Sequence, residues 1–371
     1  MRRILGGIAA GLVASFAIHA VIGAAHGTTR TRTRLVAEDG SAPLERVAIH
    51  YAPSADAVAL GVWKQLFAVL PARVDVRVEV AAARDFDRLL SVLRAAGTPH
   101  LERFHPVVVG VPITTWSRDR YAALVDDDGR GSILAPPRIE TPFVGRAGDA
   151  RSPAAISNAL YDREPRTADI VFEGGDLAAT PHFVFADANL PARNLGRGVD
   201  RTAVERELHR DFAQELVFLG DEVGEVPRHH IMMYMVPLDD GTIAVGDVHA
   251  GVALMDKDHP LALDDVDTQA ARFDRAAALL VARGFRVVRV PALVLQGGGS
   301  FVTYTNALFD RTADGTRVVY LPTYSQPALD EAAAAFYRAH GFDVHPIDVT
   351  RIYGLNGSLG CLVNVLARSS P

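Results

Sequence analysis

The chain of 371 residues has 49% hydrophobic and 22% charged residues and a formal net charge of −6. This composition excludes a disordered chain and a mini-protein that depends on disulfides, and it allows one large domain or two of medium size. The acidic balance argues against a nucleic-acid-binding protein, which needs a basic patch. Lysine occurs only at Lys64 and Lys257, and we interpret the many scattered arginines as a compositional habit.

An apolar segment opens the chain. Arg2 and Arg3 precede residues 4–25, which contain no Asp, Glu, Lys or Arg. This pattern predicts a signal peptide, with small residues near position 25 as the cleavage site, or an uncleaved membrane anchor of sufficient length. We therefore assign residues 1–25 to a signal peptide or membrane tether and expect an exported protein, periplasmic or extracellular. Residues 26–45, with a Thr-Arg repeat, are predicted to form a flexible tether.

Helical and strand patterns alternate from residue 46 onward. The predicted helices are 55–70, 85–96, 267–283 and 329–340, and the predicted strands include 74–80, 285–290 and 342–349. Gly284 and Gly341 follow the last two helices, where glycine is the usual cap. The alternation predicts an α/β fold.

A repeat runs through this α/β region. Residues 299–301 (Gly-Ser-Phe) are followed by Asn306, and residues 357–359 (Gly-Ser-Leu) are followed by Asn364, at the same offset. Further turns near positions 118, 175 and 241 complete five landmarks at similar intervals. Five units, each with a few strands and a covering helix, would close into a ring. We therefore predict one domain over residues 46–371.

Cys361 is the only cysteine, so the chain can form neither an intrachain disulfide nor a cysteine-based zinc site. A lone cysteine is most often a buried, inert thiol. The alternative is a nucleophile on a glycine-rich turn. The glycines at 297–299 lack the lysine of a phosphate-binding loop, and no Cys-His metal spacing occurs, so we predict no cofactor and no metal.

Four short segments at the repeat landmarks carry reactive side chains. They are residues 116–119 (Trp-Ser-Arg-Asp), 172–177 (Phe-Glu-Gly-Gly-Asp-Leu), 229–230 (His-His) and 354–361 (Gly-Leu-Asn-Gly-Ser-Leu-Gly-Cys). At one mouth of a ring they would supply a thiol, an imidazole that activates it and moves protons, and several carboxylates. Carboxylates repel a thiolate, so their presence indicates a cationic substrate, and a guanidinium suits paired charge-assisted hydrogen bonds.

In this order the four segments resemble the guanidino-group-modifying superfamily. It includes agmatine, arginine and peptidylarginine deiminases, dimethylarginine dimethylaminohydrolase and amidinotransferases. The resemblance spans roughly residues 107–371. It implies the pentein fold, a five-bladed α/β propeller of pseudo-fivefold ββαβ-type repeats.

The resemblance also implies a hydrolase that acts on a guanidine, as a small molecule or a side chain. Cys361 would form a covalent thiouronium, with His230 as general acid and base. Glu173 and Asp119 would hold the guanidinium, and Asp176 would contribute further to substrate binding.

Three more positions are candidates for the substrate pocket. Trp116 is assigned to packing and a pocket wall, and Arg118 and Met232 are assigned to substrate binding. Met232 stands where deiminases carry the aspartate of a His-x-Asp motif. This departure weakens the expectation of plain arginine or agmatine as substrate and leaves N-substituted guanidines and protein side chains open. His249 is the alternative base to His230.

Two other functions stay open at this point. An amidinotransferase would use the same covalent step and pass the amidino group to an amine. A catalytically silent pentein would only bind a cationic ligand, as the Met232 departure allows. The sequence leaves the substrate, the acceptor and the oligomeric state open.

Overall fold

The computed structural model describes residues 32–137 and 146–369. Thr33–Pro371 form one compact unit, to which all elements below belong. The predicted signal peptide or anchor and the first part of the predicted tether lie outside the described residues. No helix within the described ranges combines the length and apolar character needed to cross a membrane.

The strands of the described residues form five small sheets of three or four strands each. In the order of neighbouring strands, the sheets are β1 (Arg34–Leu35), β5 (Ala122–Val125), β6 (Gly131–Ala135) and β7 (Arg166–Thr167); β10 (Glu215–Leu219), β9 (Phe183–Asp187) and β8 (Ala178–Ala179); β11 (Met235–Pro237), β12 (Thr242–Asp247), β13 (Arg286–Val294) and β14 (Phe301–Thr303); β15 (Leu308–Arg311), β16 (Arg317–Thr323) and β17 (Phe342–Asp348); and β18 (Val363–Arg368), β2 (Leu44–Tyr51), β3 (Asp75–Val80) and β4 (Phe104–Val108).

One pairing pattern recurs in these sheets. β11 pairs antiparallel with β12, which pairs in parallel with β13. The same order holds for β5–β6–β7, β8–β9–β10, β15–β16–β17 and β18–β2–β3. Each parallel pair needs a crossover connection, and at least one helix lies in each of these connections. The prediction of an α/β fold is confirmed, and its repeating unit has the order ββαβ.

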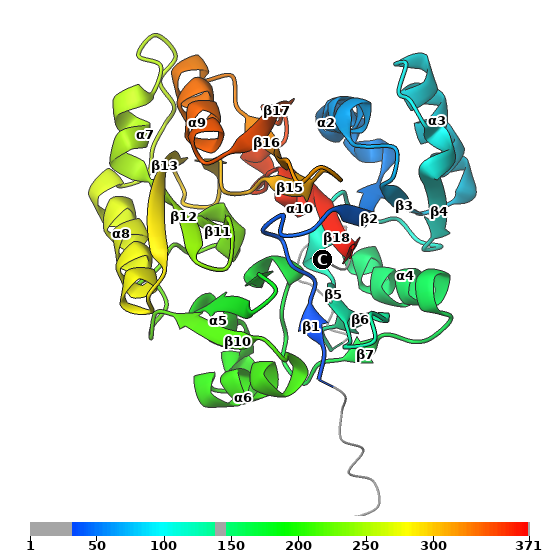
Figure 1. The fold of residues 1–371 in the computed structure, drawn as a ribbon, viewed down its shortest axis with the longest axis horizontal. Coiled ribbons are helices and arrows are strands. Elements are labelled where there is room, and N and C mark those ends of the chain that lie inside the picture. The colour runs from blue at the N-terminus through cyan, green and yellow to red at the C-terminus, as the bar shows by residue number, and fades with distance from the viewer. Residues whose placement is uncertain (1–31, 138–145, 370–371) are drawn as a thin grey trace, which may run out of the picture. The chain divides into compact units, whose positions relative to one another are not determined.

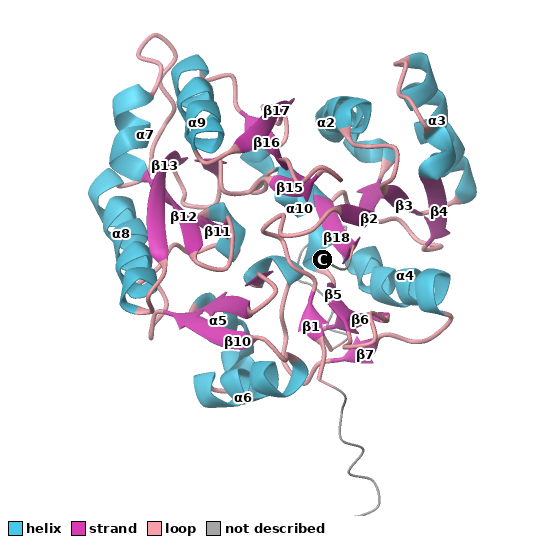
Figure 2. Ribbon diagram, in the orientation of Figure 1, coloured by secondary structure: helices cyan, strands magenta, loops and turns pink. Residues whose placement is uncertain are grey.

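Helices connect the strands, and Figures 1 and 2 show α3, α6, α7, α8 and α9 toward the periphery with most strands nearer the middle. Within the described residues, the α-helices are α2 (Asp56–Val69), α3 (Ala83–Ala95), α4 (Ser152–Tyr161), α5 (Asn189–Asn194), α6 (Arg201–Asp211), α7 (Val248–Leu254), α8 (Val266–Ala282), α9 (Pro327–Ala339) and α10 (Leu359–Leu362). The Asp265 side chain caps α8 by accepting a hydrogen bond from Thr268 N at 2.7 Å. Gly284 and Gly341 follow α8 and α9 in left-handed conformations, with φ of 90° and 81°.

Residues 33–43 are packed, which contradicts the predicted flexible tether for this segment. β1 pairs with β5, and Glu38 N donates a hydrogen bond to Ala179 O at 2.9 Å. Arg368, from the opposite end of the chain, donates to Ala42 O at 2.7 Å. The composition of the segment resembles a linker, but its partners come from distant strands that satisfy its backbone and bury its apolar side chains.

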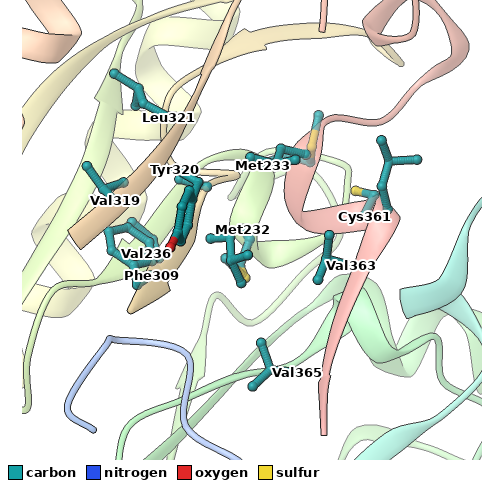
Figure 3. Close-up of a cluster of buried hydrophobic side chains, with 14 of the residues drawn as sticks. Met232, Met233, Val236, Phe309, Val319, Tyr320, Leu321, Cys361, Val363 and Val365 are labelled. Atoms are coloured by element: carbon teal, nitrogen blue, oxygen red, sulfur yellow. The ribbon is translucent and has the colours of Figure 1, made fainter. Parts of the chain in front are cut away.

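A hydrophobic core extends between the sheets and reaches the lone cysteine. Figure 3 shows Tyr320 of β16, Val363 of β18, Met232 and Cys361 in one buried cluster. The Cys361 side chain lies at an edge of this cluster, on α10, directly before β18. Buried hydrophobic side chains therefore pack against one side of Cys361.

Candidate active site

Four short helices carry or adjoin the four motif segments. They are the 3-10 helices Ser117–Asp119, Gly174–Asp176 and Ile231–Met233, together with α10. α10 contacts Ser117–Asp119, which contacts Gly174–Asp176, which in turn contacts Ile231–Met233. Segments far apart in the sequence are therefore neighbours in space.

These segments surround a cavity of about 420 Å³. Five of the predicted site residues line it, and they come from all four segments: Trp116, Asp119, Glu173, His230 and Cys361. The other lining residues are Arg146, Arg193, Arg228, His229, Leu355 and Asn356. The volume suits a small molecule or one long side chain.

Asn306 positions the thiol. Its Oδ1 accepts a hydrogen bond from Cys361 N at 3.2 Å, and its Nδ2 donates to Cys361 Sγ at 3.5 Å. Asn364, its counterpart in the sequence repeat, donates to Ser117 O at 3.3 Å and so holds the next loop. Sequence reasoning used both asparagines only as repeat markers. Both asparagines follow a Gly-Ser pair at the same distance in the sequence, and this regularity could have indicated that both hold a neighbouring loop.

His230 forms a buried ion pair with Glu173. His230 Nε2 lies 2.9 Å from Glu173 Oε2. Burial disfavours the imidazolium, but the neighbouring Cys361 sulfur, the hydrogen bond with Glu173 and the charge of Asp119 outweigh it and hold the pKa of His230 well above its ordinary value. Burial alone would favour the neutral acid of Glu173, yet His230 and two arginines hold the pKa of Glu173 well below its usual range. His230 is therefore set up as a proton donor beside the thiol.

The neighbouring histidine has the opposite character. Burial and the charge of His230 lower the pKa of His229 to about 3. Its Nδ1 accepts a hydrogen bond from His230 N at 2.7 Å. His229 is thus a neutral acceptor that orients the backbone of His230.

Asp119 lines the cavity and has one carboxylate oxygen without a hydrogen-bond partner among the described residues. One carboxylate oxygen, Oδ2, forms an ion pair with Arg146. The other, Oδ1, is buried and has no hydrogen-bond partner within the described residues. Burial, together with repulsion from Glu173, raises the pKa of Asp119. A buried, unpartnered carboxylate oxygen is costly, and an N–H donor of a ligand would satisfy it.

Arg146 and Arg193 are cavity residues that sequence reasoning missed. Arg146 also lies 3.6 Å from Asp149 and 3.9 Å from Glu173 Oε1. Arg193 contacts Glu173 Oε2 at 2.8 Å and Asp176 Oδ2 at 2.9 Å. The interpretation of the arginines as a compositional habit is wrong for these two. Neither lies in a motif, so no local sequence signal identified them.

Three predicted residues lie outside the cavity lining. The buried Arg118 side chain pairs with Glu38 and donates to Leu177 O at 2.9 Å. Asp176 accepts from Glu173 N at 2.8 Å and so shapes the turn behind the pocket. Met232 packs in the hydrophobic cluster of Figure 3.

Of the remaining candidates, Trp116 lines the cavity and His249 lies on the protein surface. Trp116 lines the cavity, and a Cβ at Gly357 would overlap its indole ring, so the glycine allows this close approach. Leu355 adds an exposed apolar rim residue. His249, the alternative base, is exposed on α7 and does not line the cavity. No group of three or more histidine, cysteine and acidic side chains in the described ranges is arranged to hold a metal ion.

No family model and no curated protein matches the chain. C. jejuni agmatine deiminase matches its structure with a TM-score of 0.65 and 16% identity, over 90% of this chain and 96% of that chain. A variant of that enzyme with serine in place of a cysteine and substrate bound matches with a TM-score of 0.66 and 17% identity, over 90% and 96%. Agmatine deiminase of Enterococcus faecalis matches with a TM-score of 0.65 and 14% identity, over 92% and 97%. The predicted resemblance to the guanidino-group-modifying superfamily is confirmed at the level of the fold, and the chain has the α/β fold of the agmatine deiminases.

Proposed function

We propose that the protein is a C–N hydrolase that acts on a guanidine through a covalent intermediate on Cys361. The observation that carries this proposal is the convergence of Cys361, His230, Glu173 and Asp119, from four separate segments, on one cavity. The deiminase-like fold supports it. The substrate-bound form of the C. jejuni enzyme with serine in place of a cysteine is consistent with a reacting cysteine.

We further propose that the five ββαβ units close into a five-bladed propeller. Four ββαβ units follow one another along the chain. The fifth combines β18, near the C-terminal end of the chain, with β2 and β3, which precede the other four units. This pairing of early and late strands would close the ring. The four motif segments would then meet at its mouth.

In the first half of the reaction, Cys361 Sγ attacks the guanidinium carbon as a thiolate, and an S–C bond forms. His230, held by Glu173 at 2.9 Å, donates a proton to the departing nitrogen. The C–N bond breaks and releases ammonia, or an amine from an N-substituted guanidine. A thiouronium remains on the sulfur.

In the second half, the imidazole of His230 takes a proton from water, and the water oxygen attacks the thiouronium carbon. The C–S bond then breaks, the electron pair returns to sulfur, and the second proton of the water passes to solvent or to the released ammonia or amine as the carbonyl forms. The product is a ureido compound, and one water is consumed for each ammonia or amine released. The raised pKa of His230 favours its role as acid in the first half.

Asp119 would hold the guanidinium with its free oxygen. Oδ1 is buried and unpartnered within the described residues, while Oδ2 is held by Arg146. Glu173 Oε1 is the second acceptor, since Arg146 lies 3.9 Å away, beyond hydrogen-bond distance. Two acceptors on one side of the cavity suit the N–H pair of a guanidinium.

The first test is labelling of Cys361 by 2-chloroacetamidine, with iodoacetamide as the uncharged comparison reagent. The ratio of the two rates separates capture of the amidinium cation from the general reactivity of the thiol. Asp119→Asn should lower this ratio by about tenfold, as expected for the loss of one charge-assisted hydrogen bond. Asp240→Asn, at a carboxylate paired with the exposed His182, serves as the matched control. A ratio that is equal in wild type and Asp119→Asn would contradict the proposed cation site.

The second test is turnover of a guanidine panel, with detection of ammonia, amines and ureido products. Product release in buffer without an acceptor amine supports the hydrolase. Turnover that requires an added amine identifies an amidinotransferase. A wild-type protein that converts no guanidine, yet binds one as tightly as Cys361→Ala does, is a silent binding protein.

We also propose that the protein is exported, on the basis of residues 1–25. N-terminal sequencing of natively expressed protein tests this. A start near Ala25 or His26 supports a cleaved signal peptide, and an intact Met1 in the membrane fraction supports an anchor. An intact Met1 in the cytoplasmic fraction contradicts export.

A further inference from the structure

The cavity is lined by more cationic than anionic side chains. Arg146, Arg193 and Arg228 line it together with the carboxylates of Asp119 and Glu173. Arg146 and Arg193 pair with carboxylates of the site, whereas Arg228 pairs with none among the described residues. Their arrangement therefore bears on which guanidines the site accepts.

Arg193 contacts the same oxygen of Glu173 that contacts His230. Its Nη2 lies 2.8 Å from Glu173 Oε2, and the same oxygen lies 2.9 Å from His230 Nε2. Its Nε contacts Asp176 Oδ2 at 2.9 Å. The side chain is 35% exposed, so a solute in the cavity can reach it. A guanidinium of the protein itself thus neutralises part of the negative charge that would attract a second cation.

Arg228 adds a positive charge at the same cavity. It is exposed, and no ion pair joins it to a carboxylate within the described residues. An arginine without a carboxylate partner keeps its planar N–H fork free for a planar anion. The unpaired charge would also repel a substrate that carries a second cation.

We propose that Arg193 is a specificity-determining residue which, together with Arg228, makes the cavity favour guanidines that also carry a carboxylate over guanidines whose other charge is positive. This inference rests on the proposed function, since it concerns the part of the substrate that Cys361 does not attack. The guanidinium end meets Asp119 Oδ1, which has no partner among the described residues. The carboxylate end meets Arg228 and the exposed edge of Arg193.

The test compares two guanidines that differ only at the far end. In 4-guanidinobutanoate a carboxylate replaces the aminomethyl group of agmatine. The ratio of kcat/KM for the two compounds is measured with the full chain, and the ratio of their Kd values is measured by calorimetry with Cys361→Ala. The wild type should favour 4-guanidinobutanoate by at least about tenfold. Arg193→Gln and Arg228→Gln should each reduce this preference several-fold, whereas Arg193→Lys should retain most of it.

Arg338→Gln is the matched control, because it removes one arginine from a surface pair with the 70% exposed Glu331. It should leave the preference unchanged. Arg228 is exposed, so its variant keeps the test valid if Arg193→Gln fails to fold.

The outcomes separate this inference from the proposed function. Turnover with equal preference, or with a preference for agmatine, overturns the inference and leaves the hydrolase intact. A charge preference in the Kd values without turnover by the wild type overturns the hydrolase and supports the inference. If neither compound binds, the inference fails, and the guanidine panel decides the hydrolase separately.

Discussion

Replacing Glu173 by glutamine should lower the pKa of His230. In the wild type, burial disfavours the imidazolium, but the neighbouring Cys361 sulfur, the hydrogen bond with Glu173 and the charge of Asp119 raise the pKa of His230 well above its ordinary value. The His230–Glu173 contact measures 2.9 Å, and a hydrogen bond to a charged group contributes about 1.5–3 kcal/mol. Because one pKa unit corresponds to about 1.4 kcal/mol, the pKa of His230 should fall by about one to two pH units.

The two arginines beside Glu173 act in the same direction. Arg193 lies 2.8 Å and Arg146 lies 3.9 Å from oxygens of Glu173. Without the carboxylate charge, both cations would face His230 with less compensation, so the decrease should lie in the upper part of this range. Asp119→Asn removes a charge that also raises the pKa of His230. Its effect should be smaller, because the hydrogen bond to Glu173 remains.

The assay is a histidine-edited NMR titration, which does not depend on knowledge of the substrate. The chain has 13 histidines, and the signal that His230→Gln removes identifies His230. Glu331→Gln, at a 70% exposed carboxylate, should leave the titration unchanged. A pKa of His230 that stays constant or rises in Glu173→Gln would refute the assignment of Glu173 as its stabilising partner.

Three further substitutions test other parts of the structure. Gly175→Ala places a Cβ where the His230 ring lies, so labelling of the thiol by 2-chloroacetamidine should slow by about tenfold or more. Glu38→Gln leaves Arg118 buried without its carboxylate, and urea denaturation should show a loss of about 3–5 kcal/mol in the free energy of unfolding. Burial raises the pKa of Asp187 to about 7. In the unfolded chain this carboxyl group loses its proton at lower pH, so the free energy of unfolding should fall between about pH 4 and pH 7. Urea denaturation at a series of pH values should show a weaker pH dependence for Asp187→Asn.

Each of these predictions has a matched control or a contrary outcome. A Cβ added at Gly61, in α2, would have no neighbouring atom within 4 Å, so Gly61→Ala should leave labelling unchanged. Unaltered labelling in Gly175→Ala would show that His230 does not need its present position. Equal stability of Glu38→Gln and wild type would show that the Arg118 pair is dispensable. A pH dependence that persists in Asp187→Asn would assign it to another group.

The helix ends could be predicted from the sequence because local chemistry determines them. The predicted helix 267–283 is found as Val266–Ala282, and Gly284 after it has the expected left-handed backbone. Glycine adopts this conformation without steric cost, so the signal is independent of distant structure. The predicted strand 342–349 is likewise found as Phe342–Asp348.

The packing of residues 33–43 could not be predicted in this way. The Thr-Arg repeat that suggested a tether lies at residues 28–34, and residues 35–43 are too short and mixed in composition to indicate a separate element. Val36 N donates to Ala123 O at 3.0 Å, and Arg368 donates to Ala37 O at 2.5 Å. Both partners are distant in sequence, so only the tertiary structure shows that this segment is buried.

The arginines of the cavity have a geometry that lysine lacks, and this explains why the motifs alone do not build the site. Arg193 bridges Glu173 and Asp176 through Nη2 and Nε. Arg146 likewise bridges Asp119 and Asp149. A planar fork with several donors can hold two carboxylates at fixed angles, whereas the single nitrogen of lysine cannot. The carboxylates of the motifs would repel one another without these two side chains, so residues outside every motif set both the positions and the charge of the groups that face the thiol.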